Sequence, residues 1–138
     1  MTAQPEPAPH PDAERNRQAI ERFRAQGNDR LLLLTTTGRK SGRALTVPVL
    51  FMRDGERTIV AAGNHGLNAP PAWYLNLVAN PGVTVEDAQG RHAATAVVVR
   101  GAERARLLRM AVKGLPFVAE YQAHTSRRIQ LIALERER

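Results

Sequence analysis

The 138-residue chain contains no cysteine, which excludes disulfide bonds, thiolate metal sites and thiol nucleophiles. Its four histidines, His10, His65, His92 and His124, include no pair at a spacing typical of metal ligands. No serine stands in a recognisable nucleophile motif, which disfavours a hydrolytic triad. We therefore expect neither a metal centre nor hydrolase chemistry.

Long apolar stretches are also missing. No run approaches the ~18 apolar residues of a membrane-spanning helix, and the N-terminus lacks the basic-then-apolar order of a signal peptide. We therefore expect a cytoplasmic protein. Residues 1–11 are rich in proline and have little to bury, so they should form a disordered leader. Residues 12–138 are long enough for one compact domain.

Aromatic residues are few: one Trp, two Tyr and three Phe. The net charge is +7, which suits a polyanionic partner such as nucleic acid, a phosphorylated cofactor or an acidic membrane surface. Proteins that bind single-stranded nucleic acid stack bases on surface aromatics, and this chain has few to offer. Nucleic-acid binding is therefore the weakest of the three alternatives.

Hydrophobic periodicity and turn signals predict short strands and a few helices. An amphipathic helix is expected over 13–26, and it could pack on the core or lie on a membrane surface. Asp54-Gly55 marks a hairpin, and Pro48 within the strand before it indicates an edge or a bulge. Repeated βαβ alternation is absent, so we expect an α+β fold that is mainly β, a small barrel of six or so antiparallel strands with peripheral helices. The expected strands are 31–37, 45–53, 58–62, 83–87, 93–100 and 129–134, and the other expected helices are 70–79, 102–113 and 117–124.

The turn Gly38-Arg39-Lys40-Ser41-Gly42 follows the first expected strand directly. Glycines let successive backbone N–H groups converge, and Arg and Lys add charge-assisted bonds to a phosphate. The turn lacks the full spacing of a Walker motif. From these residues alone, a phosphate-binding turn and an exposed basic hairpin turn both remain open.

Several motifs in a fixed order resemble the deazaflavin-dependent nitroreductase family. They are residues 33–42, Val47-Pro48, Asp54-Gly55, residues 60–62, residues 71–77 and residues 79–81. The likeness runs from about residue 30 to residue 134. It implies a split β-barrel that binds coenzyme F420, a deazaflavin with a phosphate and a glutamate tail. FMN is the alternative cofactor.

The resemblance also implies a binding site. Arg39, Lys40 and Ser41 would hold the phosphate. The residues that would border the ring and linker are Thr46, Val47, Pro48, Val49, Leu50, Ala61, Ala62, Gly63 and Asn64. Those that would close the other side are Ala72, Trp73, Tyr74, Leu75 and Asn76.

The reaction implied is hydride transfer from reduced F420 to a small electron-poor acceptor, which could be a quinone, an enone or a nitro compound. Tyr121 matches a family tyrosine that lines the substrate pocket, and it could donate a hydrogen bond or a proton, or simply pack. Leu115, Val118 and His124 stand where the family often has aromatic residues, and Leu50 likewise replaces a ring, so the substrate end departs from the family pattern. A non-catalytic F420- or lipid-binding barrel is the alternative function, and a monomer or a homodimer is equally open.

Overall fold

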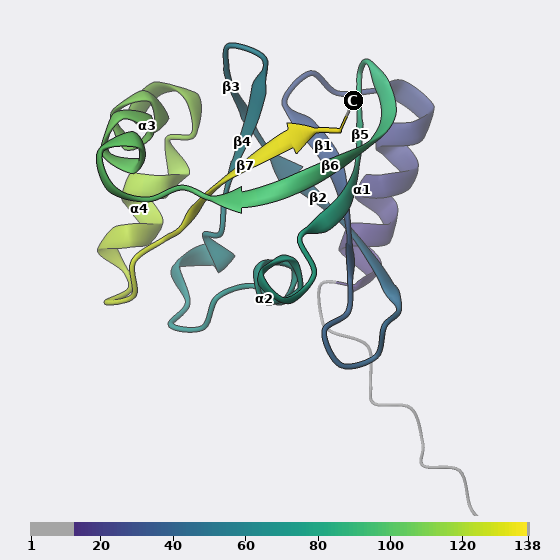
Figure 1. Ribbon diagram of the computed structural model, residues 1–138. Coiled ribbons are helices and arrows are strands. Elements are labelled where there is room, and N and C mark those ends of the chain that lie inside the picture. The colour runs from purple at the N-terminus through teal and green to yellow at the C-terminus, as the bar shows by residue number, and fades with distance from the viewer. Residues whose placement is uncertain (1–12, 138) are drawn as a thin grey trace, which may run out of the picture.

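A computed structural model describes residues 13–137, without the side chain of His65, and shows a single curled antiparallel sheet with helices around it (Figure 1). The described residues form seven strands in the order β2-β1-β5-β6-β7-β4-β3. The predicted split barrel is confirmed, whereas the predicted leader, residues 1–11, lies outside the described residues. The strands are β1 (Leu31–Thr37), β2 (Ala44–Leu50), β3 (Met52–Asp54), β4 (Arg57–Ala61), β5 (Gly82–Asp87), β6 (Gly90–Val98) and β7 (Leu131–Arg136).

The strand expected over 45–53 is in fact two strands, and this prediction was wrong. β2 pairs with β1, and β3 pairs with β4, at opposite edges of the sheet. A single residue, Phe51, joins the two edges, so the sheet must curl until they meet, and the Phe51 N–H donates to the Arg30 carbonyl at 3.2 Å. Pro48 lacks an N–H, but it is tolerated because β2 is an edge strand, as predicted.

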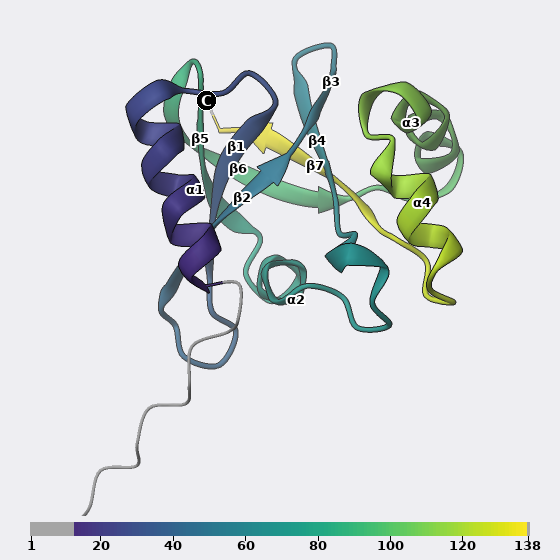
Figure 2. The same cartoon turned by 180° about the vertical axis from the view of Figure 1, so that it is seen from behind.

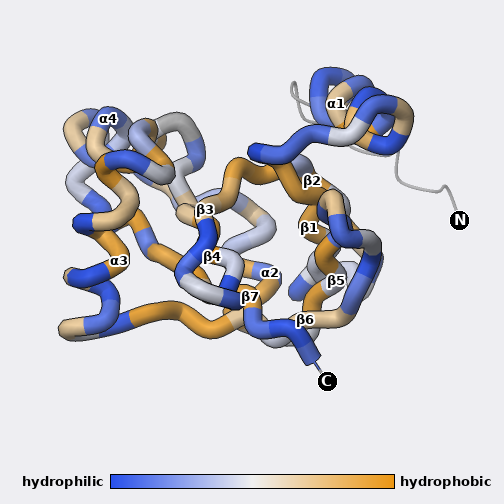
Figure 3. Tube along the Cα trace, turned by 90° about the horizontal axis from the view of Figure 1, so that it is seen from above, coloured by the Kyte–Doolittle hydropathy of each residue, from blue (hydrophilic) through white to orange (hydrophobic). Residues whose placement is uncertain are grey.

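Helix α1 (Ala13–Gln26) lies on the outside of the barrel along β1 and β2 (Figures 2 and 3). Phe23 is its buried residue, and Arg24 pairs with Glu86 of β5 at 3.3 Å. No helix within the described part of the chain has the length and apolar character needed to cross a bilayer. Peripheral membrane contact through α1 and the cytoplasmic location stay predictions.

The remaining helices are α2 (Ala72–Ala79), α3 (Gly101–Gly114) and α4 (Phe117–Ala123), with a short 3-10 turn η1 (Asn64–Gly66). α2 packs Trp73 and Leu77, which lie one helical turn apart, into a core cluster with Leu32 and Val60. α3 and α4 cover a second cluster that contains Ile59. In both ribbon views α2 lies between the β1–β2 hairpin on one side and the η1 and α4 region on the other (Figures 1 and 2).

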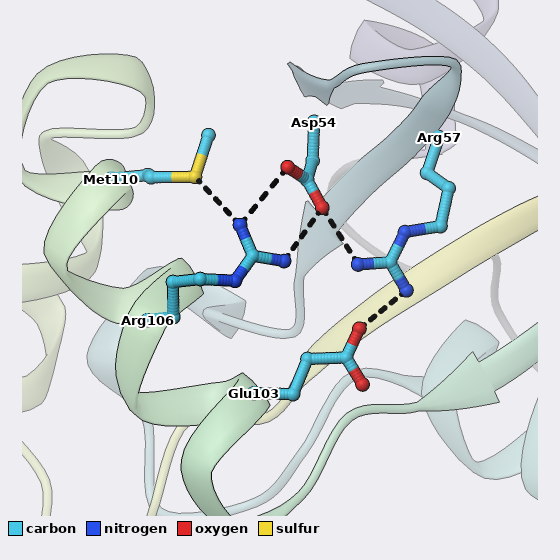
Figure 4. A network of polar contacts seen from close by, with 5 residues as sticks. All are labelled: Asp54, Arg57, Glu103, Arg106 and Met110. Carbon is cyan, nitrogen blue, oxygen red and sulfur yellow. Dashed lines mark hydrogen bonds and ion pairs between the residues drawn. The ribbon is translucent and has the colours of Figure 1, made fainter.

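A polar network ties α3 to the β3–β4 hairpin (Figure 4). The Arg106 guanidinium donates to both carboxylate oxygens of Asp54 at 3.1 and 2.9 Å. Arg57 donates to the same carboxylate at 2.6 Å and pairs with Glu103 at 2.5 Å. These hydrogen bonds, that from Arg106 first, hold the pKa of the Asp54 carboxyl well below its usual range.

Candidate functional site

The turn between β1 and β2 has a fixed backbone shape. The Gly38 N–H donates to the Arg43 carbonyl at 2.8 Å, and the Gly42 N–H donates to the Gly38 carbonyl at 2.9 Å. Gly42 has a φ of +70°, a conformation that glycine adopts without steric cost. The Ser41 hydroxyl accepts from the Arg43 N–H at 3.1 Å, and it lies where a side chain on Gly38 would clash. The two glycines and the serine therefore fix the backbone from which the basic side chains extend.

The cations on this turn have no acidic partners among the described residues. Arg39, Lys40 and Arg43 are exposed, and within residues 13–137 none of them forms an ion pair, whereas Arg53 and Arg57 do. A pocket of about 330 Å³ lies here, lined by Gly38, Arg39, Lys40, Ser41, Arg43, Ala44, Leu45 and Asn76. Uncompensated positive charge around a pocket is what a bound phosphate requires.

Asn76 of α2 connects the helix to this turn. Its side chain is 4% exposed, with the amide oxygen accepting from the Arg39 backbone N–H at 3.1 Å. The amide nitrogen donates to the Thr36 hydroxyl at 3.2 Å. The structure therefore brings Asn76, a predicted cofactor-binding residue, beside the predicted phosphate-binding residues.

Strand β2 presents two different faces. Val47 and Val49 pack against the first core cluster together with Tyr74 of α2. Because side chains alternate across a strand, their neighbours lie on the opposite face, toward α1, and their contacts with a cofactor stay predictions. These neighbours are Thr46, Pro48 and Leu50.

The other predicted cofactor residues differ in exposure. Ala72 is exposed and Leu75 is half-buried, so both can present side-chain atoms to a ligand. Trp73 is 8% exposed and belongs to the core. Ala61 and Ala62 are buried, each in a different core cluster. Their contacts with a cofactor stay predictions.

The loop after β4 packs directly on α4. Gly63 is buried, and a Cβ built on it would lie 2.7 Å from Tyr121 Cδ2 and 3.2 Å from Phe117 Cε2. The ring centroids of Phe117 and Tyr121 are 5.3 Å apart. Asn64 has a φ of 44° and donates through its side chain to the Ala69 carbonyl at 2.8 Å. Two predicted cofactor residues, Gly63 and Asn64, thus adjoin the predicted catalytic tyrosine.

The three predicted substrate-binding residues lie in different environments. Leu115 is 1% exposed and Val118 is 2% exposed, because both apolar side chains pack into the second core cluster. His124, after the last turn of α4, is exposed. Their role stays a prediction, and in this conformation His124 alone of the three reaches the surface.

Arg127 is a member of this region that sequence reasoning missed. Its guanidinium donates to the carbonyls of Ala62 at 3.0 Å, Gly63 at 2.7 Å and Leu67 at 2.8 Å. Burial lowers the pKa of the Arg127 guanidinium. These partners are at least 60 positions away in the chain, and no local pattern marks the contact.

Comparisons with known proteins agree with this architecture. Residues 10–136 match the family model for F420H(2)-dependent quinone reductases. A protein of Mycobacterium tuberculosis named an F420H(2)-dependent quinone reductase is 34% identical over 108 residues, which cover 76% of this chain and 72% of that protein.

Two solved structures are also similar. An F420-H2 dependent reductase, FDR-A, has a TM-score of 0.70 and 36% identity, and the match covers 77% of this chain and 94% of that one. A structure described as a domain-swapped dimer has a TM-score of 0.71 and 34% identity, with 86% of this chain and 96% of that one covered.

Proposed function

Since this chain belongs to the F420H(2)-dependent quinone reductase family, we propose that it reduces quinones with F420H2 as the electron donor. When bound, the reduced deazaflavin supplies a hydride, and one further proton completes the conversion of quinone to hydroquinone with release of oxidised F420. The observation that carries the proposal is the rigid β1–β2 turn. Its three cations, unpaired among the described residues, line a pocket, and its backbone is tied to α2 through Asn76.

Arg39, Lys40 and Ser41 would hold the phosphate of F420. The residues fit this group because the exposed guanidinium and ammonium have no carboxylate partner among the described residues and can form charge-assisted hydrogen bonds. Asn76 fixes the backbone beneath Arg39, so the main-chain positions from which the cations extend are set before a ligand binds. A site organised before the ligand arrives loses less entropy on binding.

The ring end of the site would lie between β2, α2 and the loop after β4. Val47, Val49 and Tyr74 give it an apolar wall that excludes water. Tyr121 adjoins the loop at Gly63, and we assign its hydroxyl as the proton donor to the developing hydroquinone oxygen. Enones and nitro compounds are further electron-poor acceptors to assay beside quinones.

The test is a fluorescence titration with F420, FMN and NADPH side by side. Lys40→Ala should weaken F420 binding about tenfold, the effect of losing one partly solvated charge-assisted bond. Lys113→Ala is the matched control, because Lys113 is the other lysine of the chain and is exposed at the end of α3. An equal effect of both variants, or no effect of either, would remove the turn from the site.

The same titration tests the cofactor, and a turnover assay beside it tests the activity. Tighter binding of FMN than of F420 would overturn the cofactor assignment. Tight F420 binding without turnover of quinones, enones or nitroarenes would instead indicate a non-catalytic F420-binding barrel. A quinone assay with F420H2, followed through the absorbance of oxidised F420, therefore accompanies the titration.

We also propose that the protein forms a homodimer. Support comes from the solved structure described as a domain-swapped dimer, which is 34% identical to this chain. Light scattering on the purified protein should give twice the chain mass of 15.2 kDa. A monomeric mass at micromolar concentration would contradict this proposal and leave the cofactor assignment intact.

A further inference from the structure

Arg127 binds the loop after β4, and we propose that it is a positioning residue of the reductase. It fixes the backbone of residues 62–67 between the cofactor ring and α4, and through Gly63 it sets the place of Tyr121. This inference rests on the proposed function, because the ring and the tyrosine take their roles from it.

The first evidence is the number and kind of its hydrogen bonds. Nε and both terminal nitrogens of the guanidinium are engaged, by the carbonyls of Leu67, Ala62 and Gly63 respectively. A planar fork that bonds three carbonyls holds them in one arrangement, which a flexible ammonium cannot reproduce. One side chain thus spans both ends of the loop.

The second evidence is what the loop supports. The Gly63 carbonyl that accepts from Arg127 also accepts from the Gly66 N–H at 2.9 Å. Gly66 has a φ of +74°, and a Cβ on it would lie 3.1 Å from both the Tyr121 carbonyl oxygen and His124 Cβ. Gly63 and Gly66 therefore both lie against α4 at Tyr121. The loop therefore packs closely against Tyr121, the proposed proton donor.

The third evidence is charge. Within residues 13–137 Arg127 forms no ion pair, so neutral carbonyls are its polar partners there. Neutral carbonyls offset the desolvation cost of a partly buried guanidinium less completely than a carboxylate partner would. The guanidinium keeps its positive charge at this end of the site, the sign that an anionic cofactor favours.

The test compares Arg127→Gln, Arg127→Lys and the matched control Arg128→Gln, since Arg128 is the next residue and is exposed. Two quantities are measured: amide hydrogen exchange of Gly66 and Leu67 without cofactor, and single-turnover hydride transfer to a quinone at saturating F420H2. The F420 dissociation constant is measured for each variant.

Arg127→Gln should speed exchange at Gly66 and Leu67 and slow hydride transfer at least about tenfold, because small displacements at a reacting centre are costly. Its F420 dissociation constant should rise less than about threefold, because the phosphate is held elsewhere and threefold is well under 1.4 kcal/mol. Arg127→Lys should lie between wild type and Arg127→Gln, and Arg128→Gln should match wild type.

Unchanged hydride transfer in Arg127→Gln would overturn the proposal. If amide exchange at Gly66 and Leu67 were faster while hydride transfer was unchanged, Arg127 would only stabilise the loop. Should Arg127→Gln not fold, Arg127→Lys and Gly63→Ala decide, because Gly63→Ala presses on the Tyr121 ring while the Arg127 side chain is kept. If both transferred hydride at the wild-type rate, the proposal would be wrong. If the wild type failed to bind F420 or to reduce a quinone, the proposed function would be refuted instead. Amide exchange is measured without cofactor, so it reports on the Arg127 contacts independently of that outcome.

Discussion

Asn76 shows how one buried amide can organise a surface site. Its oxygen holds the Arg39 N–H, and its nitrogen holds the Thr36 hydroxyl, so the side chain joins α2 to both the end of β1 and the basic turn. Thr36 is 1% exposed, which means that its hydroxyl cannot turn to water if the amide is lost. The amide therefore contributes both to stability and to the shape of the pocket.

Replacing Asn76 by alanine should destabilise the protein by about 1–3 kcal/mol, because a buried hydroxyl and a backbone N–H lose their partner. F420 affinity should fall about tenfold as the turn loses its fixed shape. Chemical denaturation and the F420 titration measure the two effects. Asn80→Ala, at an exposed position where α2 ends, is the control and should change neither. Wild-type affinity in a destabilised Asn76→Ala variant would separate stability from binding and contradict the second expectation.

At the scale of elements, the sheet is made of local hairpins that a few long-range contacts lock together. The β3–β4 hairpin joins the rest of the sheet through the pairing of β4 with β7, and β3 lies at the sheet edge. Its second support comes from α3. That support is partly apolar, because Met52 of β3 packs in the second core cluster with Leu107 of α3, and partly ionic. In the ionic part Asp54 of the hairpin contacts Arg106 of α3, and Arg57 contacts Glu103 (Figure 4). The docking of α3 should therefore depend on pH.

Asp54→Asn tests this dependence. Because the pKa of Asp54 is lowered in the folded protein, its carboxylate stabilises the fold above the unfolded-state pKa of about 4, and this contribution is lost progressively as the pH falls below that value. The melting temperature of wild type should thus exceed that of Asp54→Asn most at neutral pH, and the difference should shrink in acid. Asp29→Asn, an exposed carboxylate without an ion pair among the described residues, should show no such trend. A constant difference from pH 7 to pH 3 would count against the network.

For the whole molecule, the net charge of +7 is large for a chain of this length. Several arginines are engaged in ion pairs or bind carbonyls. The β1–β2 turn differs because it carries three cations close together, none of them paired among the described residues, beside a pocket. An anionic cofactor is attracted by both the local and the global charge. The local bonds persist at high salt better than the long-range attraction.

Salt should therefore weaken F420 binding, mainly through the long-range attraction and less through the direct contacts with the phosphate. Between roughly 0.05 and 0.5 M NaCl the dissociation constant should rise about tenfold, as screening shortens the range of the attraction. Lys40→Ala should reduce this salt dependence, because one direct phosphate contact is gone, whereas the KM for an uncharged quinone should not change. The fluorescence of Trp73, the single tryptophan, checks that the core is unaltered by salt. An affinity independent of salt would mean that the phosphate does not meet the basic turn.

Local features of the sequence determined much of the fold. The bounds of α1 and β1 and the Asp54-Gly55 turn follow from apolar periodicity and turn chemistry, which act between near neighbours in the chain. The glycine-flanked turn with Arg39 and Lys40 was visible for the same reason. The resemblance of this turn and the other motifs to one family then predicted the cofactor.

Tertiary structure alone decided how these pieces meet. The break at Phe51 has no glycine or proline to mark it, and closure of the barrel sets it. The contacts of Asn76 with Arg39 and of Arg127 with Gly63 join residues 37 and 64 positions apart. Such contacts depend on where the sheet places each segment. The sequence alone does not distinguish a polar side chain that ends in solvent from one that binds a buried carbonyl.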